Sequence, residues 1–418
     1  MGMTWKPDYL GDGFTAADLT LAADDEGPCV ATLVTYTPPV TADHPPPPDT
    51  AGGLKHLARW WSRLTDRLAP APESPTVAPP PVSAVLYIHG WSDYFLHRGL
   101  AAFYADRGAE FYALDLRKYG RSLRDGQTPG YVANLDEYDE DIDGALRAIE
   151  SRVRAQHGGG TEVRIHLMAH STGGLIASLW AHRNPGRIQS LILNSPWLDV
   201  QSNPILRGAA QGLLDPIIRF KPKARLILPE FGFYWRSISN TADGEWEIHP
   251  QWRPEFGFPI RAGWVAAVLA GHAQVRRGLA IDVPVLVLAS ARSSVSPVWN
   301  DSMLSSDSVL DVTLMTQRAL QLGPNVTVCR FEGALHDVLL SREPVRREVY
   351  RSLAGWLRCQ QAEPAVLNPR WRRYRVAGAD WSTAPPNRRS RPAYSPMARH
   401  NTRRSTSGHR TSMNTISA

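Results

Sequence analysis

The stretch VRIHLMAHSTGGLIASLW places a serine, Ser171, between an apolar run and a segment of helical character. A serine on such a tight strand-to-helix turn has its hydroxyl raised above the edge of a sheet, where it can act as a nucleophile. The two arms of the turn come together, so small residues are required at positions such as Ala169 and Gly173. Ala169 stands where glycine is usual. We predict that Ser171 is the nucleophile; the alternative is an ordinary serine at a helix N-terminus.

A serine nucleophile needs a general base, and the stretch FEGALHDVLLS offers His336 in a loop between a strand and the last helix. A histidine in this loop can reach across the sheet edge and take the serine proton. His170 adjoins Ser171 in sequence, and we expect the turn to point its side chain elsewhere. We therefore predict that His336 is the base.

The acid that orients the base is expected after the strand VPVLVLAS, because the chain order in such hydrolases is serine, acid, histidine. Ser293 stands where an aspartate would be natural, and the carboxylates follow later, at Asp301, Asp307 and Asp311. We favour Asp307, which precedes His336 by 29 residues, and keep Asp311 as the alternative. For each of them the competing interpretation is a helix-capping or surface aspartate.

An ester carbonyl under attack also needs hydrogen-bond donors for its developing negative charge. In YIHGWSDYF, Gly90 follows a strand and lets the backbone pass close to the serine, so that the Trp91 amide can point into the site. Together with the Thr172 amide it would form a two-donor oxyanion hole, in which one donor is typically worth about 3 kcal/mol. The competing interpretation is a simple loop.

These motifs lie at the ends of short apolar runs that alternate with longer helical stretches. The runs AVLYIHG, AEFYALDL, VRIHLMAH, SLILNSPW, VPVLVLAS and NVTVCRFEG have the composition of buried strands. Their alternation with helical segments predicts an α/β fold with a mostly parallel sheet flanked by helices. The interval from about 198 to 281 breaks the rhythm and is predicted to be an inserted cap.

The chain divides into four regions. We predict N-terminal strands of the main domain, a Pro-rich insertion with an amphipathic basic helix at 54–68, the catalytic domain, and an Arg-rich disordered tail; these regions span residues 1–38, 39–82, 83–358 and 359–418. Leucine and tryptophan on one side of the 54–68 helix, beside a basic stripe, suggest peripheral membrane contact, and docking on the domain is the competing interpretation.

The net charge of +6 belongs to the tail. Residues 359–418 contain eleven Arg, no Lys and two acidic residues, a net charge of +9 that leaves −3 for residues 1–358. We therefore expect no nucleic-acid binding by the folded domain. The three cysteines lack metal-site spacing, no apolar run is long enough to span a membrane, and the first residues lack a secretory pattern. We expect a cytoplasmic protein, which associates with membranes if the 54–68 helix makes the contact described above.

The motifs HGWSDYF, ALDLRKYGRSLR, AHSTGG, LNSPW and HDVLLS resemble those of α/β-hydrolases related to monoacylglycerol lipases, lysophospholipases and serine aminopeptidases, in particular an actinobacterial branch. The resemblance covers residues 83–358. Two positions depart from it: the acid is displaced from its usual Gly-x-x-Asp, and Lys118 replaces a glycine in a stretch that is structural in the family.

Serine, base and donors together predict a carboxylester hydrolase that works through an acyl-enzyme and requires neither metal nor organic cofactor. Aromatic residues of the cap suit an acyl-lipid ester such as a monoacylglycerol or lysophospholipid; they are Phe231, Phe233, Tyr234, Trp235, Trp246, Trp252, Phe256, Phe258 and Trp264. Packing of the cap onto the domain explains some of them equally well. The alternatives are a short-chain esterase or thioesterase, a haloperoxidase, and a non-catalytic protein that binds a ligand or partner.

Overall fold

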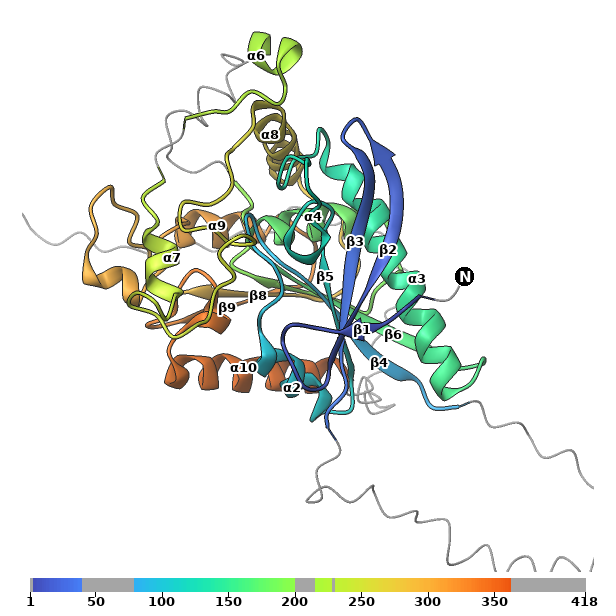
Figure 1. Cartoon of the computed structure of the whole chain (residues 1–418). Helices are drawn as coiled ribbons and strands as arrows, with labels where there is room; N and C mark the ends of the chain where they lie inside the picture. The colour runs from blue at the N-terminus through green and yellow to red at the C-terminus, as the bar shows by residue number, and fades with distance from the viewer. Residues whose placement is uncertain (1–2, 40–78, 200–214, 228–229, 362–418) are drawn as a thin grey trace, which may run out of the picture. The chain divides into compact units, whose positions relative to one another are not determined.

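The structure, a computed structural model, describes residues 3–39, 79–199, 215–227 and 230–361 of the chain. Within these ranges, nine strands form one sheet in the order β1-β2-β3-β5-β4-β6-β7-β8-β9 (Figure 1). The predicted helix at 54–68 lies outside the described residues, as do residues 362–418 of the predicted tail. Helix α10 extends to Gln361, three residues into the region predicted as the tail.

The strands from β4 onward are parallel, and the three that precede them in sequence form an antiparallel edge. Their bounds are β1 Lys6–Pro7, β2 Phe14–Asp24, β3 Gly27–Tyr36, β4 Val82–Ile88, β5 Glu110–Asp115, β6 Val163–His170, β7 Ser190–Asn194, β8 Val285–Ser290 and β9 Val326–Phe331. Buried parallel strands read as continuous apolar runs because helices cover both of their faces. For this reason β4 to β9 coincide with the six predicted runs.

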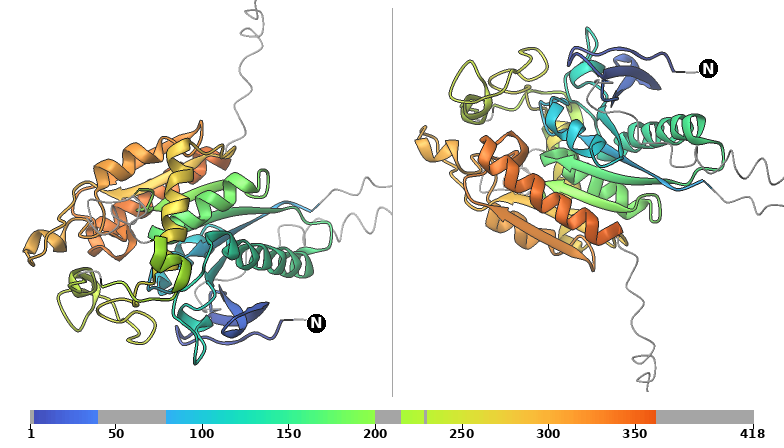
Figure 2. Two further views of the ribbon diagram at one scale, coloured as in Figure 1. Left: turned by 90° about the horizontal axis from the view of Figure 1, so that it is seen from above. Right: turned by 90° about the horizontal axis from the view of Figure 1, so that it is seen from below.

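Helices lie on both faces of the sheet (Figure 2). The helices of the described residues are α2 Arg98–Ala105, α3 Tyr138–His157, α4 Ser171–Arg183, α6 Asp215–Phe220, α7 Phe233–Ile238, α8 Ala262–Arg277, α9 Val312–Ala319 and α10 Glu343–Gln361, with short 3-10 turns η1 Gly120–Ser122, η2 Leu135–Glu137, η3 Asp301–Leu304 and η4 Val338–Leu340. Of these, α6 and α7 lie away from the sheet (Figure 1). Side chains alternate along β4: Leu86 packs in the core with α3, α4 and α8, and Tyr87 packs in the core with α2 and α10.

The interval predicted as a cap lies between β7 and β8. Its last helix, α8, is part of the main domain, since Gly271 lies against Leu175 and Leu179 of α4. Residues 230–258, which we call the cap segment, form a smaller apolar cluster in which Ile238 and Trp246 pack with Tyr94. Among the described residues, no helix is both long and apolar enough to cross a membrane.

Candidate active site

Ser171 is the first residue of α4 and directly follows β6. Its φ of +51° lies in a region that L-residues seldom adopt, and such strain is typical of functional turns. A Cβ on Gly173 would stand 2.1 Å from the His89 carbonyl oxygen, which explains why this position must be glycine. The backbone carbonyl of Ser171 accepts a 3.0 Å hydrogen bond from the Trp197 amide, so the turn is also held from the loop after β7.

His336 brings Ser171 and Asp307 together. Its Nε2 lies 3.0 Å from Ser171 Oγ, and its Nδ1 lies 2.9 Å from Asp307 Oδ2. The exposed fractions of the three side chains are small: 8% for Ser171, 2% for His336 and 0% for Asp307. An ionised carboxylate accepts a hydrogen bond from the protonated Nδ1, which leaves Nε2 free to accept the serine proton. The structure thus brings together the serine, the histidine and the favoured aspartate of the sequence prediction.

Asp307 reaches His336 although it lies on an inserted loop beyond β8. After β8 the chain pairs with its own later segment: the Asp307 amide donates to the Arg292 carbonyl and the Ser294 amide donates to the Asp307 carbonyl, at 2.9 and 2.8 Å. Ser293 binds this segment further along, where its Oγ donates to the Leu310 carbonyl at 2.8 Å. The residue at the usual acid position therefore helps to hold the loop that carries Asp307.

Asp311, the alternative acid, caps helix α9. Its Oδ1 accepts the amides of Thr313 and Leu314 at 2.9 and 3.0 Å, the pattern of an N-cap. Asp301 begins the 3-10 turn η3 and is exposed. The structure brings neither of these carboxylates to His336 in the way it brings Asp307.

His170 is buried beside the site with its ring turned away from Ser171. Its Nδ1 lies 3.0 Å from the Asn194 carbonyl oxygen, and its ring centroid lies 4.9 Å from that of His336. Burial, partly opposed by the charge of Asp337 and reinforced by His336, lowers the pKa of His170 to about 4. His170 is therefore neutral at pH 7 and places no second positive charge next to His336.

The two predicted oxyanion donors lie on segments that approach each other at Gly90. A Cβ there would stand 3.1 Å from Ser171 Cβ and 3.0 Å from His170 Cδ2, so glycine lets the turn after β4 pass close to the serine. In the described part of the chain, neither the Trp91 amide nor the Thr172 amide donates to a protein acceptor. Amides that lack an acceptor within the described residues suit donors to an oxyanion.

The sequence prediction missed a set of buried polar residues around the site. Asp337 accepts hydrogen bonds from Asn194 Nδ2 and the Leu339 amide, and its Oδ2 lies 3.1 Å from His97 Nε2. Asp93 pairs with Arg253 of the cap segment. The sequence carried a signal for both carboxylates, because Asp93 follows His89 in the motif HGWSDYF and Asp337 follows His336 in the motif HDVLLS. Nothing in the sequence marks Arg253.

The cap aromatics divide between the core and the surface. Trp264 and Phe258 are buried, and the Trp264 ring contacts that of Trp91 in a tilted arrangement with centroids 3.8 Å apart. Phe231 and Phe256, by contrast, are 46% and 60% exposed. Trp264 and Phe258 therefore belong to the packed interior, whereas Phe231 and Phe256 remain exposed aromatic side chains.

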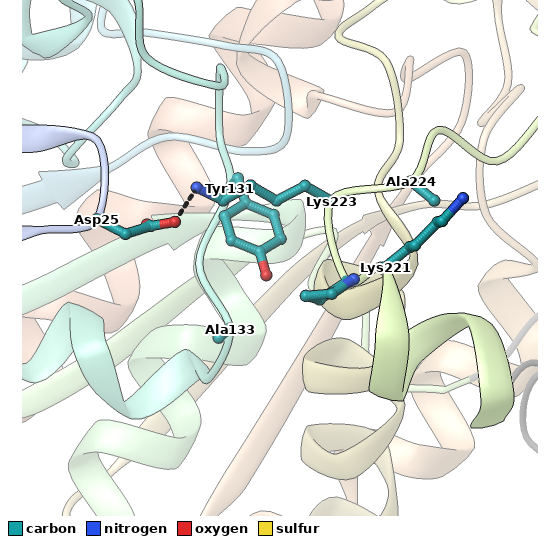
Figure 3. A pocket seen from close by; sticks show the side chains of 7 residues that line it. Asp25, Tyr131, Ala133, Lys221, Lys223 and Ala224 are labelled. Atoms are coloured by element: carbon teal, nitrogen blue, oxygen red, sulfur yellow. Dashed lines mark hydrogen bonds and ion pairs between the residues drawn. The ribbon is translucent and has the colours of Figure 1, made fainter.

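A hollow of about 570 Å³ lies between Tyr131 and the 221–224 segment (Figure 3). In Figure 3 the Lys223 side chain extends across it to Asp25, to which it donates a 2.6 Å hydrogen bond. None of Ser171, His336 and Asp307 lines this hollow, so it supplies no group to the site. Among the described residues, no group of three or more His, Cys, Asp or Glu side chains is arranged to hold a metal ion.

Comparison with known proteins assigns the chain to a family. A model of the family described as serine aminopeptidase, S33, matches residues 79–343, more than half of the chain. The monoglyceride lipase homolog of Monkeypox virus is 25% identical over 199 residues, which cover 47% of this chain and 63% of the viral protein. The chain thus spans less than two thirds of the length of that relative.

Solved structures show the same fold at low sequence identity. A soluble variant of monoglyceride lipase from Saccharomyces cerevisiae is 13% identical with a TM-score of 0.50, covering 82% of this chain and 94% of that chain. A thermostable carboxyl esterase from Bacillus coagulans is 12% identical with a TM-score of 0.51, covering 82% and 98%. The predicted α/β-hydrolase fold and the predicted resemblance to the lipase and serine aminopeptidase branch are confirmed.

Proposed function

The chain belongs to the serine aminopeptidase (S33) family of α/β-hydrolases, and on this premise we propose that it is a serine carboxylester hydrolase acting on acyl-lipid esters. The observation that carries the proposal is the chain of contacts from Asp307 through His336 to Ser171. The substrate class is a monoacylglycerol or a lysophospholipid, each of which presents one acyl ester to the serine.

In the proposed reaction, Ser171 Oγ attacks the ester carbonyl while His336 Nε2 accepts its proton. The Asp307 carboxylate holds the imidazole tautomer and stabilises the imidazolium that forms. His336 then donates the proton to the leaving alcohol, and an acyl-enzyme remains on Ser171. Water, deprotonated by His336, then attacks the acyl-enzyme. His336 returns the proton to Ser171 Oγ as the fatty acid is released.

We assign the stabilisation of the negative charge on the tetrahedral intermediate to the Trp91 and Thr172 amides. Support comes from their lack of protein acceptors within the described residues and from the close approach of Gly90 to Ser171. The Thr172 amide also lies in the first turn of α4, where the helix dipole favours a negative charge. Two such donors lower the barrier by several kcal/mol, at about 3 kcal/mol for each.

The preference for acyl lipids is supported by the viral relative, which is named a monoglyceride lipase homolog. The side chains around the proposed donor are also apolar, since the Trp91 ring lies 3.8 Å from the Trp264 ring in a tilted arrangement and meets Phe258 edge-on at 6.1 Å. Apolar walls with few polar groups are the usual lining for an acyl chain.

An aminopeptidase requires a carboxylate that binds the substrate amine. The buried carboxylates beside the site, Asp93 and Asp337, are engaged by Arg253 and His97 respectively. We therefore place ester hydrolysis before peptide hydrolysis.

The test is hydrolysis of p-nitrophenyl esters from acetate to palmitate and of a monoacylglycerol, together with labelling by a fluorophosphonate. We expect kcat/KM to rise with acyl length and both activity and labelling to vanish in Ser171→Ala. Ser178→Ala is the matched control, because Ser178 is a buried serine of the same helix whose Oγ donates to the Gly174 carbonyl at 2.7 Å. The Ser178→Ala variant should keep both its activity and its labelling.

Turnover of short esters alone would refute the lipid preference and retain the mechanism. Faster hydrolysis of aminoacyl nitroanilides than of any ester would favour the aminopeptidase. A folded wild-type protein without turnover or label would refute the proposal and favour a non-catalytic binding protein.

A further inference from the structure

Asp93 connects the cap segment to the turn that carries the proposed oxyanion donor. It lies in the turn after β4 and is 1% exposed. Its Oδ1 accepts a 2.8 Å hydrogen bond from Arg253 Nη1, and its Oδ2 lies 3.4 Å from the Gly90 amide, which donates to it. Gly90 directly precedes Trp91. One carboxylate thus joins an arginine of the cap segment to the backbone of the site.

The cap segment binds this turn at two further points. The Phe258 amide donates to Ser92 Oγ at 3.0 Å, and the His249 amide donates to Tyr94 Oη at 2.9 Å. Ser92 has a φ of +49°, a conformation that costs an ordinary L-residue free energy. The turn is therefore strained, and contacts from outside must hold it in this form.

The same segment also contacts the loop that carries His336. Tyr234 Oη accepts a 3.2 Å hydrogen bond from the Asp337 amide, and the Tyr234 ring meets the His336 ring edge-on at 5.2 Å. The Arg253 guanidinium lies 5.0 Å from the centroid of the Tyr234 ring. Arg253 thus contacts Asp93, which binds the turn that carries Trp91. It also contacts Tyr234, which binds the loop that carries His336.

The Asp93–Arg253 ion pair is buried on both sides. Burial raises the pKa of Asp93, but the Arg253 charge, with smaller contributions from His170 and His89, leaves it below its usual value. Arg253 is 6% exposed, and within the described residues Asp93 is the only carboxylate with which it forms an ion pair. Removing one member of such a pair leaves the other buried and uncompensated.

We propose that Arg253 is a positioning residue for hydrolysis at Ser171: through Asp93 it holds the Gly90–Trp91 turn so that the Trp91 amide faces the reacting carbonyl. The inference rests on the proposed function. It also makes the oxyanion site depend on the seating of the cap segment, so an unseated cap leaves Ser171 and His336 in contact but without the Trp91 donor.

The test compares Arg253→Met and Arg253→Lys with Arg236→Met, a matched control. Arg236 is also in the cap segment and pairs with Asp243 at 2.5 Å, but both side chains are exposed. The measurements are kcat and KM on a p-nitrophenyl ester, the fluorophosphonate titre of active serine, and the affinity for a trifluoromethyl ketone, which forms an oxyanion on the serine.

For Arg253→Met we expect kcat to fall about 10- to 100-fold. This loss is at most as large as that caused by removing an oxyanion donor, which lowers kcat about 100- to 1000-fold. KM and the serine titre should stay near the wild-type values, and the ketone should bind more weakly in parallel with kcat. Arg253→Lys keeps the charge and should restore part of the loss, and Arg236→Met should match the wild type.

Wild-type kcat in a fully titrated Arg253→Met protein would overturn the inference, as would a fall in kcat with unchanged ketone affinity. If Arg253→Met does not fold, the double variant Asp93→Asn, Arg253→Met removes the buried charge, and its kcat should fall by the same factor. A folded double variant with wild-type kcat overturns the inference. Absence of turnover and labelling in the wild type is a distinct result and refutes the proposed function itself.

Discussion

Asp307 is the residue whose role is most sharply testable, because the chain offers a matched aspartate four positions later. Replacing Asp307 with asparagine retains an oxygen for the amides of Val309 and Leu310, which Oδ1 accepts at 2.8 and 2.7 Å. The loop should therefore keep its conformation, with a stability change within about 1 kcal/mol. At the Oδ2 position, however, an NH₂ group would face His336 Nδ1.

That NH₂ group donates to Nδ1 and moves the imidazole proton to Nε2, where it blocks acceptance of the Ser171 proton. The same change in serine proteases lowers kcat about 10⁴-fold, and we expect a loss of 10³- to 10⁴-fold here. A loss of 10⁴-fold corresponds to about 5 kcal/mol of transition-state stabilisation. The assay is kcat on a p-nitrophenyl ester, with a urea unfolding curve for each variant.

Asp311→Asn is the control, because asparagine is as good an N-cap as aspartate and helix α9 should be unaffected. We expect wild-type kcat and stability. Retention of more than a tenth of wild-type kcat by Asp307→Asn would refute the reasoning, and so would a large loss in Asp311→Asn, since the acid would then be the alternative aspartate.

Three further predictions concern stability. Because Ser171 has a φ of +51°, Ser171→Gly should be more stable than Ser171→Ala by about 1 kcal/mol in urea unfolding, and equal stabilities would contradict a strained turn. Gly173→Ala should cost about 1–3 kcal/mol because the new Cβ meets the His89 carbonyl, whereas Gly159→Ala, which meets nothing within 4 Å, should be neutral. Burial lowers the pKa of His272 to about 4, below the value of 6.5 for a free histidine, so the unfolded chain binds more protons between these values. Stability should then fall as the pH drops from about 6.5 to about 4, by at most about 3 kcal/mol for this residue, and the urea midpoint of His272→Gln should depend less steeply on pH.

The strands were predictable because burial on both faces requires continuous apolar runs, and Ser171 and His336 were located because each follows such a run. The position of Asp307 depends on the backbone pairing of residues 292–294 with Asp307 across an insertion, and no local sequence pattern encodes this pairing. In the sequence, Asp307 was favoured over Asp311 only because it begins an Asp-x-Val-x-Asp stretch and precedes His336 by 29 residues. The contact between Asp307 and His336 supplies a physical reason for that preference.

The contacts of the cap segment were beyond the sequence for a different reason. Arg253 binds Asp93 across 160 positions, and a lone arginine in an aromatic segment is indistinguishable from a surface residue. The division of the aromatics was equally hidden, because Trp264 and Phe256 have the same composition signal but are 1% and 60% exposed. Such distinctions arise only from tertiary packing.

The insertion that displaces the acid is closed at its base by backbone hydrogen bonds between residues 292–294 and Asp307. A loop sealed in this way can change length while its stem stays in place, and each doubling of a flexible loop costs only about 0.6 kcal/mol. Residues 295–298, where Val295 and Val298 are more than half exposed, are thus a site where natural variation or a grafted peptide can be accommodated without moving the carboxylate, whereas Met303 further along the loop is buried. A segment inserted at 295–298 would leave the stem in place, and with it the 2.9 Å distance from the Asp307 carboxylate to the imidazole.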